Sequence, residues 1–231
     1  MIKKIISLFL VLITVLVCAV ACADRPSNDG DGSGTDTSDT DSQTTDSSSG
    51  NVDTGIDYSG VNVSDYITSI LYKELEIELE DENSSKEDAL WEAILEQMDM
   101  SKYPQDKVDY YFRQSKDYYM YLARGDEKQY PLVLKHYGTS EEKMMEQARQ
   151  LVKKDLAYLY IVREENIRLT DAEKTEHFDM YVDKYVNDYG YKRDYVLANM
   201  KHLIEESMLY DKTMEFLISK NTFEVKQTQP A

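Results

Sequence analysis

The sequence predicts an all-α folded part built from extended helical arms or hairpins, preceded by a disordered tether. Apolar residues recur at helical spacing through two long segments, 104–124 and 140–166. Only three glycines follow Gly60, and each stands where a helical pattern stops, as a left-handed helix C-cap requires. By contrast, residues 23–60 are mostly Asp, Ser, Thr and Gly, which bury too little apolar surface to offset the entropy of ordering.

The first residues indicate a secretory signal peptide at 1–21, in which Lys3 and Lys4 precede an apolar run at 5–17. The run closes on small residues followed by Cys22, and this ending resembles the lipobox of bacterial lipoproteins. The resemblance implies that Cys22 carries a diacylglyceryl group and anchors the mature chain on the extracytoplasmic face of the bacterial cell membrane. An ordinary signal peptide and an uncleaved anchor helix are the alternatives.

Cysteine content and charge exclude several classes of function. Cys18 and Cys22 are the only two cysteines, so the folded part has no disulfide, thiol nucleophile or thiolate metal site. The formal net charge is -18, and from Tyr58 onward 35 acidic side chains face 23 basic ones. A field of this sign argues against nucleic acid and anionic lipid as partners and weakly favours basic ones.

Composition divides the mature chain into a tether at 22–60, a transition segment at 61–83, a helical domain at 84–224 and a disordered tail at 225–231. Within the transition segment, residues 72–79 alternate between polar and apolar, which is typical of a half-buried strand. This strand has no obvious partner in the sequence. A lone strand packed along helices and a short helix fit the segment equally well.

Capping signals place the helices of the domain. They are the capping-box spacings of Ser84 with Glu87 and of Thr170 with Glu173, a first-turn Pro104, and a cap at Thr139 or Ser140. The longest helix has a core stripe spaced 3, 4, 4 and 3 residues apart, formed by Met145, Ala148, Val152, Leu156 and Leu159. A last helix runs from Leu197 to Ile218. Segments 140–166 and 104–124 would span about 40 Å and about 30 Å, lengths that favour arms over a compact bundle.

Tyrosine and methionine are frequent, with 19 Tyr and 10 Met in the chain. Tyr combines apolar area with a polar tip and Met adapts to irregular shapes, so surfaces rich in both suit promiscuous binding. The alternative is that these side chains are half-buried packing residues in a thin domain. The residues expected to contact a bound polypeptide are Tyr111, Tyr118, Tyr119, Tyr121, Leu122, Met144, Tyr158, Tyr181 and Tyr185.

Signals of catalysis are weak. The sequence has no P-loop, GxGxxG, HExxH or GxSxG motif. His177 and His202 each have glutamates within one helical turn, but carboxylates lie near every histidine in so acidic a chain. The paired acids at 141–142, 164–165 and 205–206 point in different directions on a helix, which indicates solvated faces. We therefore expect no enzymatic activity, cofactor or metal.

Five short motifs follow one another along the second half of the chain: TSEE at 139–142, VKKDL at 152–156, EENIRLTDAE at 164–173, YGY at 189–191 and DKTMEFL at 211–217. Together they resemble the C-terminal domain of trigger factor, the helical peptide-binding fold shared with SurA-type chaperones. Segment 104–124 would be the preceding arm helix. The ribosome-docking and prolyl isomerase domains of trigger factor have no counterpart in this sequence. The resemblance therefore implies client holding without isomerase chemistry and transfers no catalytic residue.

The expected function is that of a membrane-anchored, extracytoplasmic, chaperone-like protein. It would hold unfolded or nascent exported polypeptides in a groove between its arms and would attach to the membrane through lipidated Cys22. The alternative is a structural or adaptor lipoprotein that grips one specific folded partner or a second copy of itself.

Overall fold

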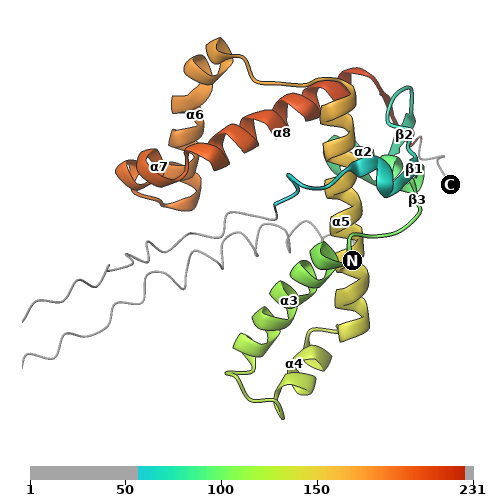
Figure 1. Cartoon of the computed structure of the whole chain (residues 1–231), viewed down its shortest axis with the longest axis vertical. Helices are drawn as coiled ribbons and strands as arrows, with labels where there is room; N and C mark the ends of the chain where they lie inside the picture. The colour runs from blue at the N-terminus through green and yellow to red at the C-terminus, as the bar shows by residue number, and fades with distance from the viewer. Residues whose placement is uncertain (1–56, 227–231) are drawn as a thin grey trace, which may run out of the picture.

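The structure, a computed structural model, describes residues 57–226, which form a mostly helical fold around one long central helix (Figure 1). The signal peptide, Cys22, nearly all of the tether and residues 227–231 lie outside the described residues. Seven α-helices between residues 57 and 226 confirm the predicted, largely all-α class. No helix in this part of the chain is both long enough and apolar enough to cross a membrane.

The elements follow one another with short connections. In chain order they are the 3₁₀ turn η2 (Val63–Asp65), β1 (Ile67–Ser69), β2 (Glu76–Leu79), α2 (Lys86–Glu96), β3 (Asp99–Met100), α3 (Gln105–Leu122), α4 (Tyr130–His136), α5 (Glu141–Glu164), α6 (Asp171–Tyr189), α7 (Arg193–Asn199), α8 (Lys201–Ser219) and β4 (Thr222–Val225).

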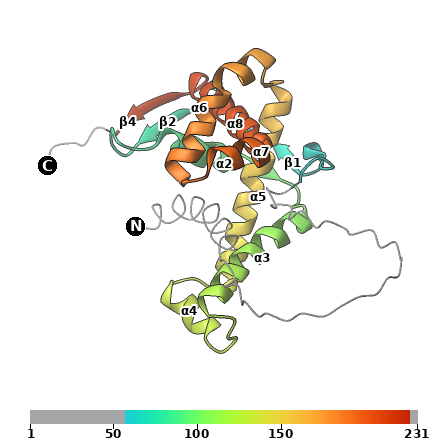
Figure 2. The same cartoon turned by 90° about the vertical axis from the view of Figure 1, so that its left-hand side faces the viewer.

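Two helical arms project from the same side of α5 (Figures 1 and 2). Arm 1 consists of α3, α4 and the first half of α5, and arm 2 consists of α6, α7 and the first half of α8. Each arm has a small apolar core of its own. A larger main core joins α2, the rest of α5, the end of α8 and the chain between residues 58 and 79. Both arms are thus attached to a shared base.

Local signals placed most helix ends correctly. Ser140 caps α5, because its hydroxyl accepts a hydrogen bond from the Lys143 backbone N–H at 3.3 Å. Thr170 and Glu173 form the predicted reciprocal capping box of α6. The Ser84 cap was wrong by one residue, since it is Ser85 whose hydroxyl accepts the bond from Asp88. Pro104 stands at the N-cap position of α3, one residue before the predicted first turn.

All three glycines after Gly60 adopt the predicted left-handed backbone conformation. Gly125, Gly138 and Gly190 have φ angles of 74°, 65° and 74°. Gly190 ends α6 directly, whereas Gly125 and Gly138 follow α3 and α4 after one or two further residues. A residue other than glycine is strained at such φ angles, so these positions fix where the arm helices stop.

The last predicted helix is two helices in the structure. The chain leaves helical geometry at Met200, with φ −115° and ψ 13°, so α7 ends and α8 begins there. Met200 is only 7% exposed and packs in the core of arm 2. The bend lets α7 fold back against α6 while α8 continues to the main core, an arrangement that a continuous helix could not make.

The strand predicted at 72–79 covers only Glu76–Leu79 in the structure, and it has a partner that the sequence did not indicate. β2 pairs in parallel with β4, with Glu76 opposite Thr222 and Leu79 opposite Val225. Val225 therefore belongs to the folded domain and not to the predicted tail. A second pair, β1 with β3, is antiparallel and was also not predicted. Both pairs are short, and both lie at the base of the arms.

Candidate binding surfaces on the two helical arms

Large apolar side chains that stay exposed are concentrated on the arms. Among residues 57–226, nine such side chains are exposed, and only Leu71 and Val225 lie in the base. Single exposed apolar residues are ordinary, but their concentration on two projecting arms is informative. Arm 1 carries three and arm 2 carries four, each 40% to 65% exposed, and we call them the exposed arm residues: Tyr121, Leu132, Tyr137, Met180, Tyr189, Tyr195 and Leu197.

Arm 1 presents its aromatic side chains near the end of the short helix α4. Tyr137 directly precedes Gly138, where the chain turns into α5. Its ring packs 5.8 Å from the buried ring of Tyr119 while its other side faces solvent. Lys143 donates a hydrogen bond to the Gly138 carbonyl at 2.8 Å, which secures the turn. The exposed ring is therefore held by a fixed helix end.

Arm 2 carries a continuous row of four tyrosines, here called the tyrosine ladder, made of Tyr189, Tyr185, Tyr191 and Tyr195. Tyr185 lies 5.5 Å from Tyr189 and 6.4 Å from Tyr191, measured between ring centroids. Tyr191 stacks on Tyr195 at 5.9 Å with an interplanar angle of 11°. The left-handed Gly190 makes this geometry, because it reverses the chain so that the Tyr191 N–H donates to the Tyr185 carbonyl at 3.4 Å. The ladder joins the end of α6 to the start of α7.

Three residues predicted to contact a client are core residues. Met144 is 0% exposed and Tyr119 is 3% exposed, and both belong to the core of arm 1. Tyr181 lies in the core of arm 2, with its hydroxyl donating to Asp211 at 2.7 Å. Because these residues are 0% to 8% exposed, they pack inside the arms and offer almost no surface to a client in this fold, which corrects the expectation for all three.

The other predicted contact residues divide between open and half-buried positions. Tyr121 is 65% exposed near the end of α3. Tyr158 packs against Tyr210 at 5.6 Å, and burial raises its pKa to about 12. Tyr185 belongs to the tyrosine ladder. The remaining three residues are also half-buried: Tyr111, Tyr118 and Leu122.

Sequence reasoning missed most of the exposed arm residues. It did not select Leu132, Tyr137, Met180, Tyr189, Tyr195 or Leu197. Two of these had a readable signal, because Tyr137 and Tyr189 each directly precede a helix-ending glycine. A side chain at the last position of a helix, or directly after it, has no following helical turn that could cover it.

A buried carboxylate lies where arm 1 joins the base. Asp155 on α5 accepts hydrogen bonds from the Tyr111 hydroxyl at 2.7 Å and from the Tyr58 hydroxyl at 2.8 Å, both at Oδ2. Burial raises the pKa of Asp155, and the two hydroxyl donors oppose that effect. Burial beside the carboxylate also raises the pKa of each tyrosine well above its usual range. The hydroxyl groups therefore remain protonated and act as donors.

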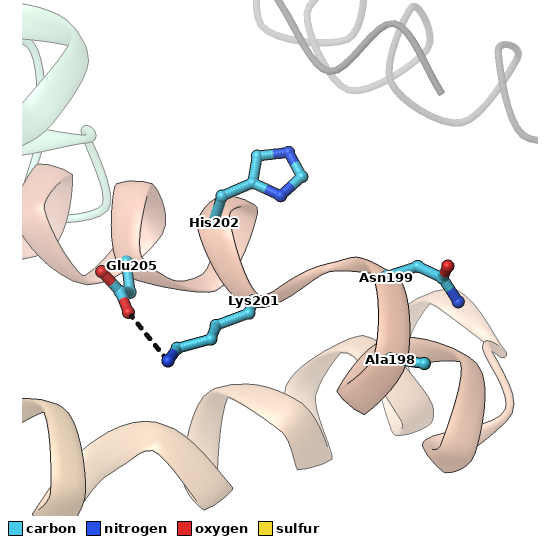
Figure 3. Close-up of a pocket in the computed structure, with 5 residues that line it drawn as sticks. All are labelled: Ala198, Asn199, Lys201, His202 and Glu205. Atoms are coloured by element: carbon cyan, nitrogen blue, oxygen red, sulfur yellow. Dashed lines mark ion pairs between the residues drawn. The ribbon is translucent and has the colours of Figure 1, made fainter. Parts of the chain in front are cut away.

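The histidines do not form metal sites in the structure. Around the bend between α7 and α8 lies a shallow hollow lined by Ala198, Asn199, Lys201, His202 and Glu205 (Figure 3). Figure 3 shows the His202 ring directed away from the ion pair between Lys201 and Glu205. Glu205 also pairs with Lys174 at 2.8 Å. Over the described range, 57–226, no group of three or more His, Cys, Asp or Glu side chains could hold a metal ion.

Glu173, the carboxylate near His177, is also engaged elsewhere and gives the first testable prediction. Lys212 on α8 donates to it at 2.6 Å and Thr170 donates at 2.7 Å, which lowers its pKa to about 2. Because the folded-state pKa is depressed, the ionised group stabilises the fold above its ordinary pKa of 4.5, and this contribution disappears as pH falls through about 2. We expect a carbon-13 NMR titration of the Glu173 carboxyl to show a midpoint near 2.

Two variants control this titration. Glu173→Gln should lose its stability deficit relative to the natural protein as pH falls towards 2, measured by urea unfolding at a series of pH values. Glu176→Gln, at an exposed position of the same helix, should change the free energy of unfolding at neutral pH by less than about 0.5 kcal/mol. A Glu173 midpoint near 4.5 would show that the contact with Lys212 is not maintained in solution.

Comparisons with protein-family models, with curated proteins and with solved structures give no match for this chain.

Proposed function

We propose that this chain is a holding protein of chaperone type, which binds unfolded or partly folded exported polypeptides with its two arms. The observation that carries the proposal is the placement of the exposed arm residues. They supply aromatic and thioether surface on two projections that extend from the same side of α5 (Figure 2). Clients would be held through many weak contacts with Tyr, Leu and Met side chains.

Anchoring and charge complete the proposal. Lipidation of Cys22 would hold the domain at the extracytoplasmic face of the membrane through the tether, where exported chains emerge. The surplus of acidic over basic side chains from Tyr58 onward favours clients with basic as well as apolar segments. Holding requires no catalytic step, and clients would be released by mass action. The likeness of the second half of the sequence to the trigger factor C-terminal domain supports the same function.

Replacing exposed arm residues of either arm should weaken holding without unfolding the protein. Serine replaces Tyr121, Leu132 and Tyr137 in one variant, and Tyr189, Tyr195 and Leu197 in a second. Substitutions at exposed positions change the stability of the free protein little. Aromatic side chains that become buried in a complex dominate its binding energy, so each variant should raise the dissociation constant for a client at least about tenfold. The measurement is suppression of aggregation of two unrelated denatured clients, with peptide affinity measured by fluorescence anisotropy.

The base of the domain provides the matched control. Leu71→Ser together with Val225→Ser removes exposed apolar surface of similar kind outside the arms and should keep full activity. Equal losses in the base variant and the arm variants would contradict the assignment of binding to the arms. A protein that protects neither client but co-purifies with one stoichiometric partner would instead be a structural or adaptor lipoprotein.

A further inference from the structure

The first described residues lie beside α5. We call residues 57–62 the strap. In Figure 1 it approaches α5 from the side on which the arms project, and in Figure 2 it lies beside α5 next to β1. A short turn, closed by the Val61 N–H donating to the Tyr58 carbonyl at 2.9 Å, shapes it. The strap thus lies against α3 and α5, where arm 1 joins the base.

Apolar packing and a few polar contacts hold the strap in place, since Tyr58 and Val61 pack against the main core. The Tyr58 hydroxyl donates to Asp155 at 2.8 Å, and the Lys107 ammonium lies 5.5 Å from the centre of the Tyr58 ring. Arg163 donates to the Val61 carbonyl at 2.9 Å. Tyr58 therefore fills a slot between α3 and α5 as an aromatic side chain whose hydroxyl meets a carboxylate. The hydrogen bond from Arg163 goes to a backbone carbonyl, so a segment of different sequence could accept the same bond.

The slot does not depend on the strap for its shape. Tyr111, which forms one wall, donates to the same Asp155 oxygen at 2.7 Å. The carboxylate therefore keeps one donor when Tyr58 is absent and has lone pairs free for another. A buried carboxylate without enough donors is unfavourable, so the slot favours a group that brings a hydrogen.

Release of the strap would remove Tyr58 and Val61 from the edge of the main core but none of its buried residues. Val63 and Ile67, which follow it, are 5% and 9% exposed and belong to that core. Asp57, at its other end, is exposed and continues into the preceding chain. The strap is thus an intramolecular ligand with an effective concentration on the order of millimolar or above. A client can bind only after the strap has left the slot. The apparent affinity of the client is therefore its intrinsic affinity multiplied by the fraction of molecules with an open slot.

We infer that the slot between α3 and α5 binds an aromatic side chain with a hydrogen-bond donor, Tyr or Trp, from an extended client segment, and that the strap is its built-in competitor. The inference rests on the proposed function, because it names the kind of segment that the arms hold. It also explains why Tyr111, which the sequence analysis selected as a client contact, lies beside a tyrosine of the same chain.

The test uses the full chain and a labelled, unstructured peptide that contains one Tyr, with fluorescence anisotropy as the readout. Tyr58→Ala should bind the peptide about tenfold more tightly than the natural protein, as expected when the strap is docked in about nine molecules of ten. Tyr58→Ala should also prefer this peptide to its Tyr→Phe analogue. Tyr58→Phe keeps the ring of the strap and should give an intermediate affinity. Tyr66→Ala, a change in the same part of the chain whose ring lies near Lys102, should leave affinity unchanged.

The outcomes separate this inference from the proposed function. If the natural protein binds the peptide and a folded Tyr58→Ala variant binds equally or more weakly, the strap is not a competitor although the arms still hold clients. If no variant binds any peptide, the proposed function fails and the inference fails with it. In NMR spectra of Tyr58→Ala, the bound Tyr peptide should shift signals of Tyr111 and Asp155, and unshifted signals would overturn the assignment of the slot.

Discussion

Asn221→Ala is expected to lower the free energy of unfolding by about 2–4 kcal/mol. Asn221 lies between α8 and β4 and is only 9% exposed. Its side chain accepts a hydrogen bond from the Leu75 N–H at 2.8 Å and donates to the Tyr72 carbonyl at 3.0 Å. Both partners belong to buried residues, so alanine would leave a buried backbone donor and acceptor without this partner. Urea unfolding monitored by circular dichroism measures the effect.

Two variants show whether these hydrogen bonds are the cause. Asn199→Ala removes an exposed asparagine whose amide donates only locally, to the Tyr195 carbonyl at 3.0 Å, and should change stability by less than about 0.5 kcal/mol. Asn221→Asp keeps the acceptor for the Leu75 N–H and removes the donor to the Tyr72 carbonyl. It should therefore also lower the free energy of unfolding substantially, and it tests the donor separately from the acceptor. If Asn221→Ala proves as mild as Asn199→Ala, the contact between β2 and the end of α8 contributes little to the fold.

Helix positions were predictable because their signals are local. A capping box is readable within four residues, and a left-handed C-cap is readable at a single glycine. Thr170 with Glu173 and the three late glycines therefore gave correct helix ends. The strand pairing was not readable in this way. Leu75 and Asn221 are 146 residues apart, and nothing in either segment specifies the other.

The binding surface was less predictable because tyrosine suits both buried and exposed positions. Tyr119 and Tyr121 are two residues apart on α3, yet one is 3% and the other 65% exposed, since they point to opposite sides of the helix. The neighbouring helix decides which of the two is covered. Asp155 gave no signal at all, because its burial depends on Tyr58 and Tyr111, which come from distant parts of the chain.

Met144 shows how a shift of one residue changes an assignment. The sequence analysis placed Met145 in the core stripe of α5 and Met144 on the binding surface. In the structure Met144, Ala148, Val152 and Leu156 recur every four residues and are each at most 1% exposed. Met145 is half-buried against the main core. The observed stripe begins one residue earlier because arm 1 and the base cover one continuous face of the helix.

Met144→Ala is accordingly expected to destabilise arm 1 by about 2–5 kcal/mol, the range for removing a large buried side chain and leaving a cavity. Met144 packs with Tyr119, Ala123, Tyr130 and Leu134 in a core separate from the main one. The loss should therefore act on the arm before it acts on the whole domain. Native-state hydrogen exchange should accelerate at the amides of α4 and the end of α3 while those of α2 stay protected.

Met180→Ala is the matched control, because Met180 is 59% exposed on arm 2 and its removal should alter stability by less than about 0.5 kcal/mol. Equal acceleration of exchange in α2 and α4 would show that arm 1 unfolds only together with the base. A Met144→Ala variant with unchanged exchange but weakened peptide binding would place Met144 on the binding surface after all. Loss of order in arm 1 should also weaken client holding, because Tyr121, Leu132 and Tyr137 are positioned by the helices that this core joins.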